Sequence, residues 1–300
     1  MPDLTGKRVL VTGVTSGLGA DIARELAAQG AEVVLAARSE QKLAATVADI
    51  EHRVRDPRLA QVVVDLSDLG SVRRAAAHAS RLGPIDVLIN NAGVMATPYK
   101  RTADGFELQF ATNHLGPFAL TGLLLPQLVA SGDGRVVNTG SQAHRLARRA
   151  PLGDPAVQSG RYSTWQAYAQ SKLADLLFTF ELDRRLREAE LPVKALAAHP
   201  GYSATGLMHS RHSLAGSANA ATRILEGAFT LLGQPAELGA LPTLMAATAD
   251  LPGSTYVGPD GPAQMRGTPR IVAPAKRAHD RDAQRRLWEI SETATGVRYP

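Results

Sequence analysis

Residues 8–19 read RVLVTGVTSGLG, a short apolar run that passes through a glycine-rich turn into a helical pattern. Glycines spaced in this way carry structural meaning where a strand leads directly into a helix. Gly13 permits a tight turn, Gly17 lets the backbone approach a pyrophosphate, and Gly19 allows close contact between helix and strand. The free N–H groups at the start of the helix can bind phosphate oxygens. The stretch therefore predicts a dinucleotide-binding βα unit, although a purely structural turn would use the same glycines.

Short runs rich in Val, Leu, Ile and Ala alternate with segments of helical periodicity along the rest of the chain. The predicted strands are Arg8–Thr12, Glu32–Ala37, Gln61–Asp65, Asp86–Asn90, Arg135–Thr139, Val193–His199 and Ser254–Val257. The predicted helices are Leu18–Gln29, Gln41–Arg53, Phe106–Leu128, Gln166–Glu188 and Asp280–Ser291. Continuous hydrophobicity is typical of parallel strands buried on both faces. The pattern predicts an α/β fold: a single-domain, doubly wound parallel sheet (Rossmann-like) with helices on both faces.

Length and composition agree with one globular domain. The chain has 300 residues, of which 44% are hydrophobic and 20% charged, and it shows neither repeats nor a Gly/Ser linker. We expect one domain over 1–300, with an insertion at about 145–163 and a C-terminal helical extension at about 266–300. The absence of cysteine excludes disulfides, thiolate metal ligands and a cysteine nucleophile. No metal site is expected.

Neither a signal peptide nor a run of about 18 apolar residues is readable, so we expect a cytoplasmic protein without a transmembrane segment. The formal net charge is +5, with arginines gathered at 145–149 and 266–286. These clusters lack interleaved aromatic residues and any nucleic-acid motif, so no nucleic-acid partner is expected. A solvated arginine-rich surface explains them, and a basic rim that attracts an anionic substrate or lipid headgroup is the alternative.

The end of the second predicted strand discriminates between the two nicotinamide dinucleotides. A site selective for NAD(H) carries an acid there for the ribose 2′-hydroxyl, whereas one selective for NADP(H) carries a cation. Here the strand is followed by Arg38 and Ser39, and the first acid is Glu40. Arg38 can bind a 2′-phosphate through its forked guanidinium. We therefore expect NADP(H) rather than NAD(H), with an ordinary surface arginine as the alternative.

Two further strand ends face the same crevice. Asp65-Leu66 closes the third strand, where an adenine amino group could bind, and Asn91-Ala92-Gly93 follows the fourth. The latter tripeptide would turn the chain beside the cofactor, although a plain β-turn uses the same residues. After the sixth strand, Pro200-Gly201 redirects the chain across the nicotinamide end, and Thr205 could bond the carboxamide.

Tyr168 and Lys172 stand four residues apart in a helical pattern and therefore share one helix face. A neighbouring ammonium stabilises phenolate, which suits a tyrosine to proton exchange with an alcohol or carbonyl. Ser141 follows the fifth strand, where its hydroxyl can bind a substrate oxygen. Asn113 lies inside a predicted helix, either as a buried amide or as a water-binding member of a proton relay. Tyr-x-x-x-Lys alone also arises often by chance.

Taken in order, these motifs resemble the short-chain dehydrogenase/reductase family over roughly residues 5–260. The resemblance implies Tyr168 as acid/base, Lys172 as the residue that lowers its pKa and holds the nicotinamide ribose, Ser141 as the carbonyl-positioning group, and Asn113 in the relay. The cofactor-binding residues it implies are Gly13, Thr15, Ser16, Gly17, Leu18, Gly19, Arg38, Asp65, Leu66, Asn91, Ala92, Gly93, Tyr168, Lys172, Pro200, Gly201 and Thr205. Asn113-His114-Leu115-Gly116 and His199-Pro200-Gly201 resemble the retinol dehydrogenase/protochlorophyllide reductase-like branch.

The chain departs from that family in the 27-residue separation of Ser141 from Tyr168, where about a dozen is usual. The added segment, Arg145–Ser163, predicts a lobe at the mouth of the site, and it leaves monomer and homo-oligomer both open. Two alternatives to an active NADP(H) oxidoreductase remain: a catalytically inactive NADP(H)-binding sensor and a nucleotide-sugar epimerase-like enzyme. The expected partner is a small-molecule carbonyl or alcohol substrate. A lipid-like substrate rests on family analogy alone.

Overall fold

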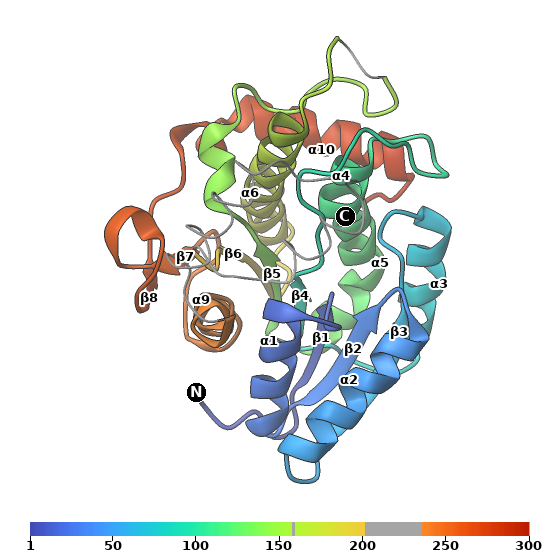
Figure 1. Cartoon of the computed structure of the whole chain (residues 1–300), viewed down its shortest axis with the longest axis vertical. Helices are drawn as coiled ribbons and strands as arrows, with labels where there is room; N and C mark the ends of the chain where they lie inside the picture. The colour runs from blue at the N-terminus through green and yellow to red at the C-terminus, as the bar shows by residue number, and fades with distance from the viewer. Residues whose placement is uncertain (158–159, 202–235, 300) are drawn as a thin grey trace, which may run out of the picture.

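An eight-stranded sheet forms the centre of the computed structural model, which describes residues 1–157, 160–201 and 236–299 (Figure 1). The strand order is β3-β2-β1-β4-β5-β6-β7-β8, parallel throughout except for the antiparallel pair β7–β8. The strands are β1 (Arg8–Thr12), β2 (Glu32–Ala37), β3 (Arg58–Val63), β4 (Val87–Asn90), β5 (Gly134–Thr139), β6 (Val193–Ala198), β7 (Tyr256–Pro259) and β8 (Pro269–Ile271). Thr205 lies outside the described residues.

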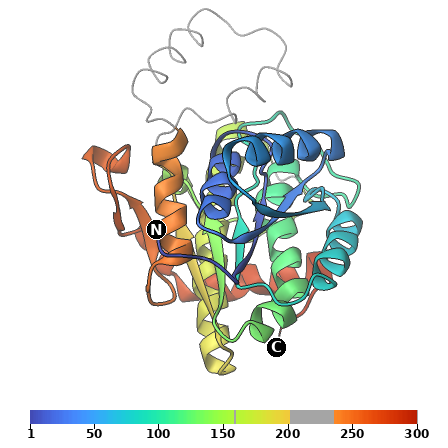
Figure 2. The same ribbon diagram turned by 90° about the horizontal axis from the view of Figure 1, so that it is seen from below.

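Helices cover both faces of this sheet (Figure 1 and Figure 2). The α-helices are α1 (Gly17–Ala28), α2 (Glu40–Arg53), α3 (Leu69–Ser80), α4 (Leu108–Phe110), α5 (Gly116–Ala130), α6 (Thr164–Glu188), α9 (Ala236–Thr248) and α10 (Arg281–Thr295). Alternate residues of a strand enter different cores: Val9 and Val11 pack under α1 and α9, whereas Leu10 packs under α3 and α5. This period of two is the reason that the strands are apolar at every position.

The fold class predicted from the sequence is confirmed. Two strands have the bounds that were predicted, and the bounds of other elements differ from the prediction. β1 and β2 have the predicted bounds, but β3 ends at Val63, two residues before Asp65. The antiparallel β8 and helices α3 and α9 were not predicted. A three-residue strand carries too little pattern to read, and α9 is apolar around its whole circumference rather than on one face.

The helix predicted over Phe106–Leu128 is observed over Leu108–Ala130, but it is not one regular α-helix. The segment contains the short α4, a π-helical turn over Ala111–Leu115, and then α5. Pro117 lies at the junction of the π-helical turn and α5, where it has no N–H to donate to the preceding turn. A π-turn inserts one extra residue per turn and so changes which side chains face the sheet. Periodicity over a long window does not detect one irregular turn.

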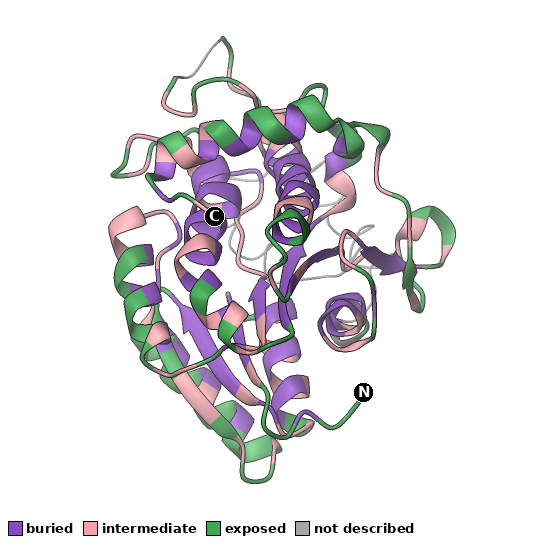
Figure 3. Cartoon of the chain, turned by 180° about the vertical axis from the view of Figure 1, so that it is seen from behind, coloured by how far each residue is buried: buried purple, intermediate pink, exposed green. Residues whose placement is uncertain are grey.

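Helix α10, near the C-terminus, packs against α5 and α6. Trp288 of α10 is almost fully buried, and its ring contacts those of Phe118 on α5 and Phe178 on α6. Figure 3 shows α6 buried along most of its length, whereas α2 and α10 keep exposed outer faces. Within the described ranges, no helix combines the length and the apolar character needed to cross a bilayer.

Candidate active site

The turn between β1 and α1 admits only glycine at two of its positions. Gly13 has a φ of +75°, and a Cβ added to it would lie 2.8 Å from the Cα of Ala92. A Cβ on Gly19 would lie 2.2 Å from the carbonyl oxygen of Gly13 and 2.5 Å from Nδ2 of Asn91. The sequence-based reason for Gly19, close helix–strand contact, is therefore observed directly.

The first turn of α1 has no side-chain cap. Ser16 is the N-cap residue in extended conformation, but its hydroxyl makes no capping hydrogen bond. Thr15 precedes it in the turn, and Gly17 and Leu18 open the helix. By contrast, side chains cap α2, α3 and α6. An uncapped helix start behind a glycine turn fits an anionic ligand such as a pyrophosphate.

The ends of β2 and β3 lie next in the sheet, both on the same side of β1. Arg38 directly follows β2 and is exposed, and its guanidinium has no hydrogen-bond or ion-pair partner within the described parts of the chain. The Ser39 hydroxyl accepts a hydrogen bond from the N–H of Lys42 and so caps α2. Asp65, beyond the end of β3, accepts hydrogen bonds at Oδ1 from the N–H and the hydroxyl of Ser67. The neighbouring Leu66 is buried.

The Asn91-Ala92-Gly93 turn is tied to β1 by a residue that the sequence analysis missed. The Thr12 hydroxyl accepts hydrogen bonds from the N–H groups of Asn91 and Ala92, both at 3.0 Å. The Asn91 amide in turn donates to the Thr12 carbonyl at 2.9 Å. Thr12 is fully buried, so these bonds join the ends of β1 and β4 rigidly. The Asn91 side chain thus supports the turn, and the open surface beside it belongs to Gly93.

Asn113 lies in the π-helical turn and joins three parts of the site. Its Oδ1 accepts a hydrogen bond from the Val94 N–H at 2.8 Å, and its Nδ2 donates to the Val94 carbonyl and to the Ser171 hydroxyl, both at 2.9 Å. The Ser171 hydroxyl donates a hydrogen bond to the carbonyl of Tyr168 at 2.8 Å. A Cβ added to Gly93 would lie 3.1 Å from Oδ1 of Asn113. Asn113 is therefore a structural link between the β4 loop and α6.

Tyr168 and Lys172 lie on one face of α6, as their spacing predicts, and both are buried. The Lys172 ammonium donates to the Thr139 carbonyl at the end of β5 (2.8 Å) and to Oδ2 of Asp175 (3.0 Å). Burial disfavours the ammonium, but the charges of Asp175 and Tyr168 outweigh that effect and raise the pKa of Lys172. Lys172 is therefore a cation beside Tyr168 at neutral pH.

Ser141 follows β5 and caps a short 3₁₀ helix, Gln142–Leu146, by accepting from the Ala143 N–H. The His144 ring is hydrogen-bonded to the backbone of Ser141. The Ala275 N–H donates to its Nε2 at 3.0 Å, so Nδ1 carries the proton and donates to the Ser141 carbonyl at 2.6 Å. The C-terminal extension thus supports the position of Ser141, a contact that sequence spacing does not reveal.

Pro200 and Gly201 turn the chain after β6, as expected. Gly201 has a φ of +69°, and a Cβ on it would lie 2.5 Å from the Met265 carbonyl oxygen. Its N–H donates to Nδ1 of His199 at 3.2 Å, so His199 carries its proton on Nε2 and donates to Gln264 at 3.1 Å. Burial lowers the pKa of His199 to about 4, and the neutral ring acts as a fixed connector.

The Arg145–Ser163 insertion is anchored to the loop after β4. The Tyr162 hydroxyl donates to Glu107 at 2.9 Å and accepts from the Gln109 amide at 2.7 Å, while Oε1 of Gln109 accepts from the Ala96 N–H. The Tyr162 ring also contacts that of Tyr99. The lobe and the loop therefore form one unit next to the Tyr168 end of α6.

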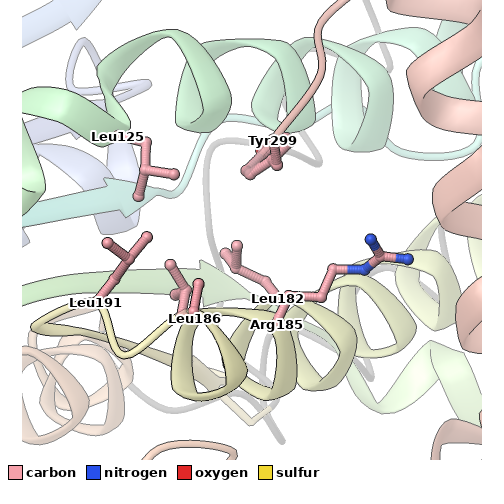
Figure 4. A pocket seen from close by; sticks show the side chains of 7 residues that line it. Leu125, Leu182, Arg185, Leu186, Leu191 and Tyr299 are labelled. Carbon is pink, nitrogen blue, oxygen red and sulfur yellow. The ribbon is translucent and has the colours of Figure 1, made fainter.

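A hollow elsewhere on α6 serves as a contrast to this site. It lies between α5 and α6 near their C-terminal ends (Figure 4). Its lining is Leu125, Leu182, Arg185, Leu186, Ala189, Leu191 and Tyr299. Leu182 is ten residues beyond Lys172 on the helix, which places the hollow about 15 Å from the polar site along the axis. Its lining is apolar apart from Arg185 and Tyr299, and the Tyr299 hydroxyl donates to the Phe118 carbonyl at 2.6 Å.

Comparison with known proteins agrees with this geometry. The sequence profile described as "short chain dehydrogenase" matches residues 7–152. Human retinol dehydrogenase 13 is 39% identical over 99% of this chain and 87% of its own, and mouse polyprenol dehydrogenase is 38% identical over 99% and 86%. A crystal structure from Mycobacterium paratuberculosis is 44% identical, covers 100% of this chain and 97% of its own, and superimposes with a TM-score of 0.81.

Proposed function

Because the chain belongs to the short-chain dehydrogenase/reductase family, in its retinol dehydrogenase-like branch, we propose that it is an NADP(H)-dependent oxidoreductase that interconverts an alcohol and a carbonyl compound. One observation carries the proposal. Tyr168 and the cationic Lys172 are buried side by side on α6, and Lys172 is bonded to the end of β5 two residues before Ser141. This brings an acid/base group and a hydroxyl to the carboxyl edge of the sheet, where ligands of such folds bind.

The residues present fit a nicotinamide dinucleotide. A Cβ at Gly13 or Gly19 would fill the turn before α1, and the helix start behind it has no side-chain cap. The N–H groups of Gly17 and Leu18 would hold the pyrophosphate. At the other end, a Cβ at Gly93 would approach Asn113 and, at 3.8 Å, the Lys172 ammonium. Lys172 would there hold the nicotinamide ribose.

When bound, the nicotinamide supplies or accepts the hydride. In the reducing direction, the Tyr168 phenol donates its proton to the substrate oxygen, on which negative charge develops. The Ser141 hydroxyl donates a hydrogen bond to the same oxygen. Lys172 stabilises the phenolate that remains, and Asn113 keeps the β4 loop in register with α6. Oxidation of an alcohol uses the same groups in reverse.

The choice of NADP(H) rests on Arg38. Its exposed guanidinium follows β2 without a partner within the described ranges, whereas Glu40 belongs to the first turn of α2. A 2′-phosphate beside β2 would form charge-assisted hydrogen bonds with this group.

We further propose a lipid-like alcohol or aldehyde as the substrate. Two relatives have retinol and polyprenol in their names, and both are long apolar primary alcohols. The surface beside Tyr168 suits such a molecule: Trp165, one turn earlier on α6, is 48% exposed, and Leu146 of the adjacent 3₁₀ helix is 67% exposed. Apolar side chains left in water near a polar reaction centre can cover an alkyl chain.

The decisive experiment is the Tyr168→Phe variant. NADPH consumption is measured with retinal and with a set of compact aldehydes and ketones, and NADPH affinity is measured separately by fluorescence. We expect turnover to fall at least about 100-fold while NADPH still binds, because only the proton donor is lost. Turnover that survives in the variant would refute the acid/base role of Tyr168. A wild-type protein that binds NADPH but reduces none of these compounds would support the sensor.

A further inference from the structure

Asp175 is an acid within an apolar helical run, and the sequence analysis did not single it out. It follows Leu173-Ala174 and precedes Leu176-Leu177, all buried in α6. The separations from Tyr168 to Lys172 and from Lys172 to Asp175 are four and three residues, so the three side chains form one stripe on the helix. An ionisable group in such surroundings needs a partner.

That partner is Lys172. The Asp175 Oδ2 to Lys172 Nζ distance is 3.0 Å, and each side chain is only 7% exposed. The second bond of the ammonium, to the Thr139 carbonyl, fixes it at the end of β5. Burial raises the pKa of Asp175 to about 6, against the opposing effect of Lys172, so the carboxylate is still ionised at neutral pH.

Among the residues that the structure describes, the neighbouring elements contribute no competing acid to this pair. Tyr256 reaches it from β7; burial raises the pKa of its phenol, Arg145 opposes this, and Asp175 and Tyr168 add to it, so the phenol stays neutral. The Tyr256 hydroxyl is buried, with no hydrogen-bond partner within the described residues. His144, from the 3₁₀ helix, is neutral because burial lowers its pKa to about 4. Asp175 is therefore the anion that balances the positive charge of Lys172.

We propose that Asp175 is a positioning residue for Lys172 that also offsets part of its charge, so that the ammonium acts on Tyr168 less strongly than an unpaired lysine would. The carboxylate holds the ammonium on the stripe that leads to Tyr168, and its negative charge opposes phenolate formation there. Tyr168 and Asp175 are seven residues apart, about 10 Å along the axis. At an effective dielectric constant of about 20, a unit charge at about 10 Å changes a pKa by about one unit.

The inference rests on the proposed function of Tyr168 and is tested with Asp175→Asn. Asparagine keeps the shape and an acceptor for Lys172 but removes the charge. Two pH titrations are compared in wild type and variant: the rate of retinol oxidation, and tyrosinate absorbance near 295 nm with the Tyr168→Phe spectrum subtracted. We expect both midpoints to fall by about one pH unit in the variant.

The matched control is Asp183→Asn. Asp183 is another buried acid of α6; it lies eight residues beyond Asp175 and pairs with Arg187. The control substitution should lower stability but leave both midpoints unchanged, and Asp175→Glu, which keeps the charge, should leave them close to the wild-type values. If Asp175→Asn does not fold, Asp175→Ser takes its place, because it removes the same charge and leaves room for water.

A folded, NADPH-binding Asp175→Asn protein with unshifted midpoints would overturn the inference, and so would an upward shift. Failure of the proposed function gives a different result, since Tyr168→Phe would then retain turnover. The absorbance titration needs no substrate. It therefore tests the electrostatic role of Asp175 even if retinol is not oxidised.

Discussion

Replacing Gly19 with alanine should distort the turn between β1 and α1 without touching any of the proposed acid/base groups. The new methyl group would lie 2.2 Å from the Gly13 carbonyl oxygen, where about 3.0 Å is the least that real contacts show. The start of α1 must therefore move away from β1 by about 0.8 Å or more. Both neighbours, Gly13 and the Asn91 amide that bonds Thr12, are held in place, so the strain cannot be relieved by rotating a flexible side chain.

Overpacking of this kind costs about 1–3 kcal/mol of folding free energy. Displacement of the helix start should weaken NADPH binding by about 10- to 100-fold, which corresponds to about 1.4–2.8 kcal/mol. Urea unfolding followed by circular dichroism measures the first effect, and NADPH fluorescence titration measures the second. Gly153→Ala is the matched control, since its Cβ would meet no atom within 4 Å. If Gly19→Ala equals wild type in both assays, the close approach of α1 to β1 is not the constraint that the structure indicates.

Two further outcomes are expected. Arg38→Asp should lower kcat/KM for NADPH by about 10- to 100-fold relative to NADH, because it replaces the cation proposed to bind the 2′-phosphate with an anion. An unchanged cofactor preference in steady-state kinetics would contradict the proposed role of Arg38. Burial lowers the pKa of His114 to about 3 and those of His144 and His199 to about 4, from a usual value of 6.5. Since the unfolded chain then binds more protons below pH 6.5, stability should be lost as the pH falls from about 6.5 toward 4. Each histidine changes the free energy of unfolding by up to about 1.4 kcal/mol per pH unit. Burial raises the pKa of Asp175, so its effect has the opposite sign and offsets the contribution of one histidine. Urea unfolding at pH 7 and at pH 5 checks this, and equal stabilities would show that the rings are accessible to protons in the folded state.

The parts of the site that were predictable are those in which one short segment dictates its own geometry. The turn at Gly13–Gly19 and the Tyr168–Lys172 pair depend on local backbone conformation and helix periodicity, which sequence spacing records directly. The departure from one regular helix over Phe106–Leu128 arose where a single π-helical turn interrupts that periodicity. Asp175 could have been noticed as a lone acid in an apolar run, but its ion pair with Lys172 needs the α6 face to be buried against β5.

By itself, the sequence determined the alternation of strands and helices, the glycine turn and the order of the acid/base residues, because each of these depends on neighbours within about one helical turn or one strand. Only the tertiary structure decided which distant groups support them. The Thr12 hydroxyl holds the β4 turn, and Ala275 fixes the His144 ring that bonds the Ser141 carbonyl. These contacts join residues far apart in the chain, and they form only when the sheet brings strand ends together and the C-terminal extension packs beside them. The spacing of residues in the sequence does not predict these long-range contacts, because burial and the hydrogen bonding of buried polar groups are properties of the whole fold.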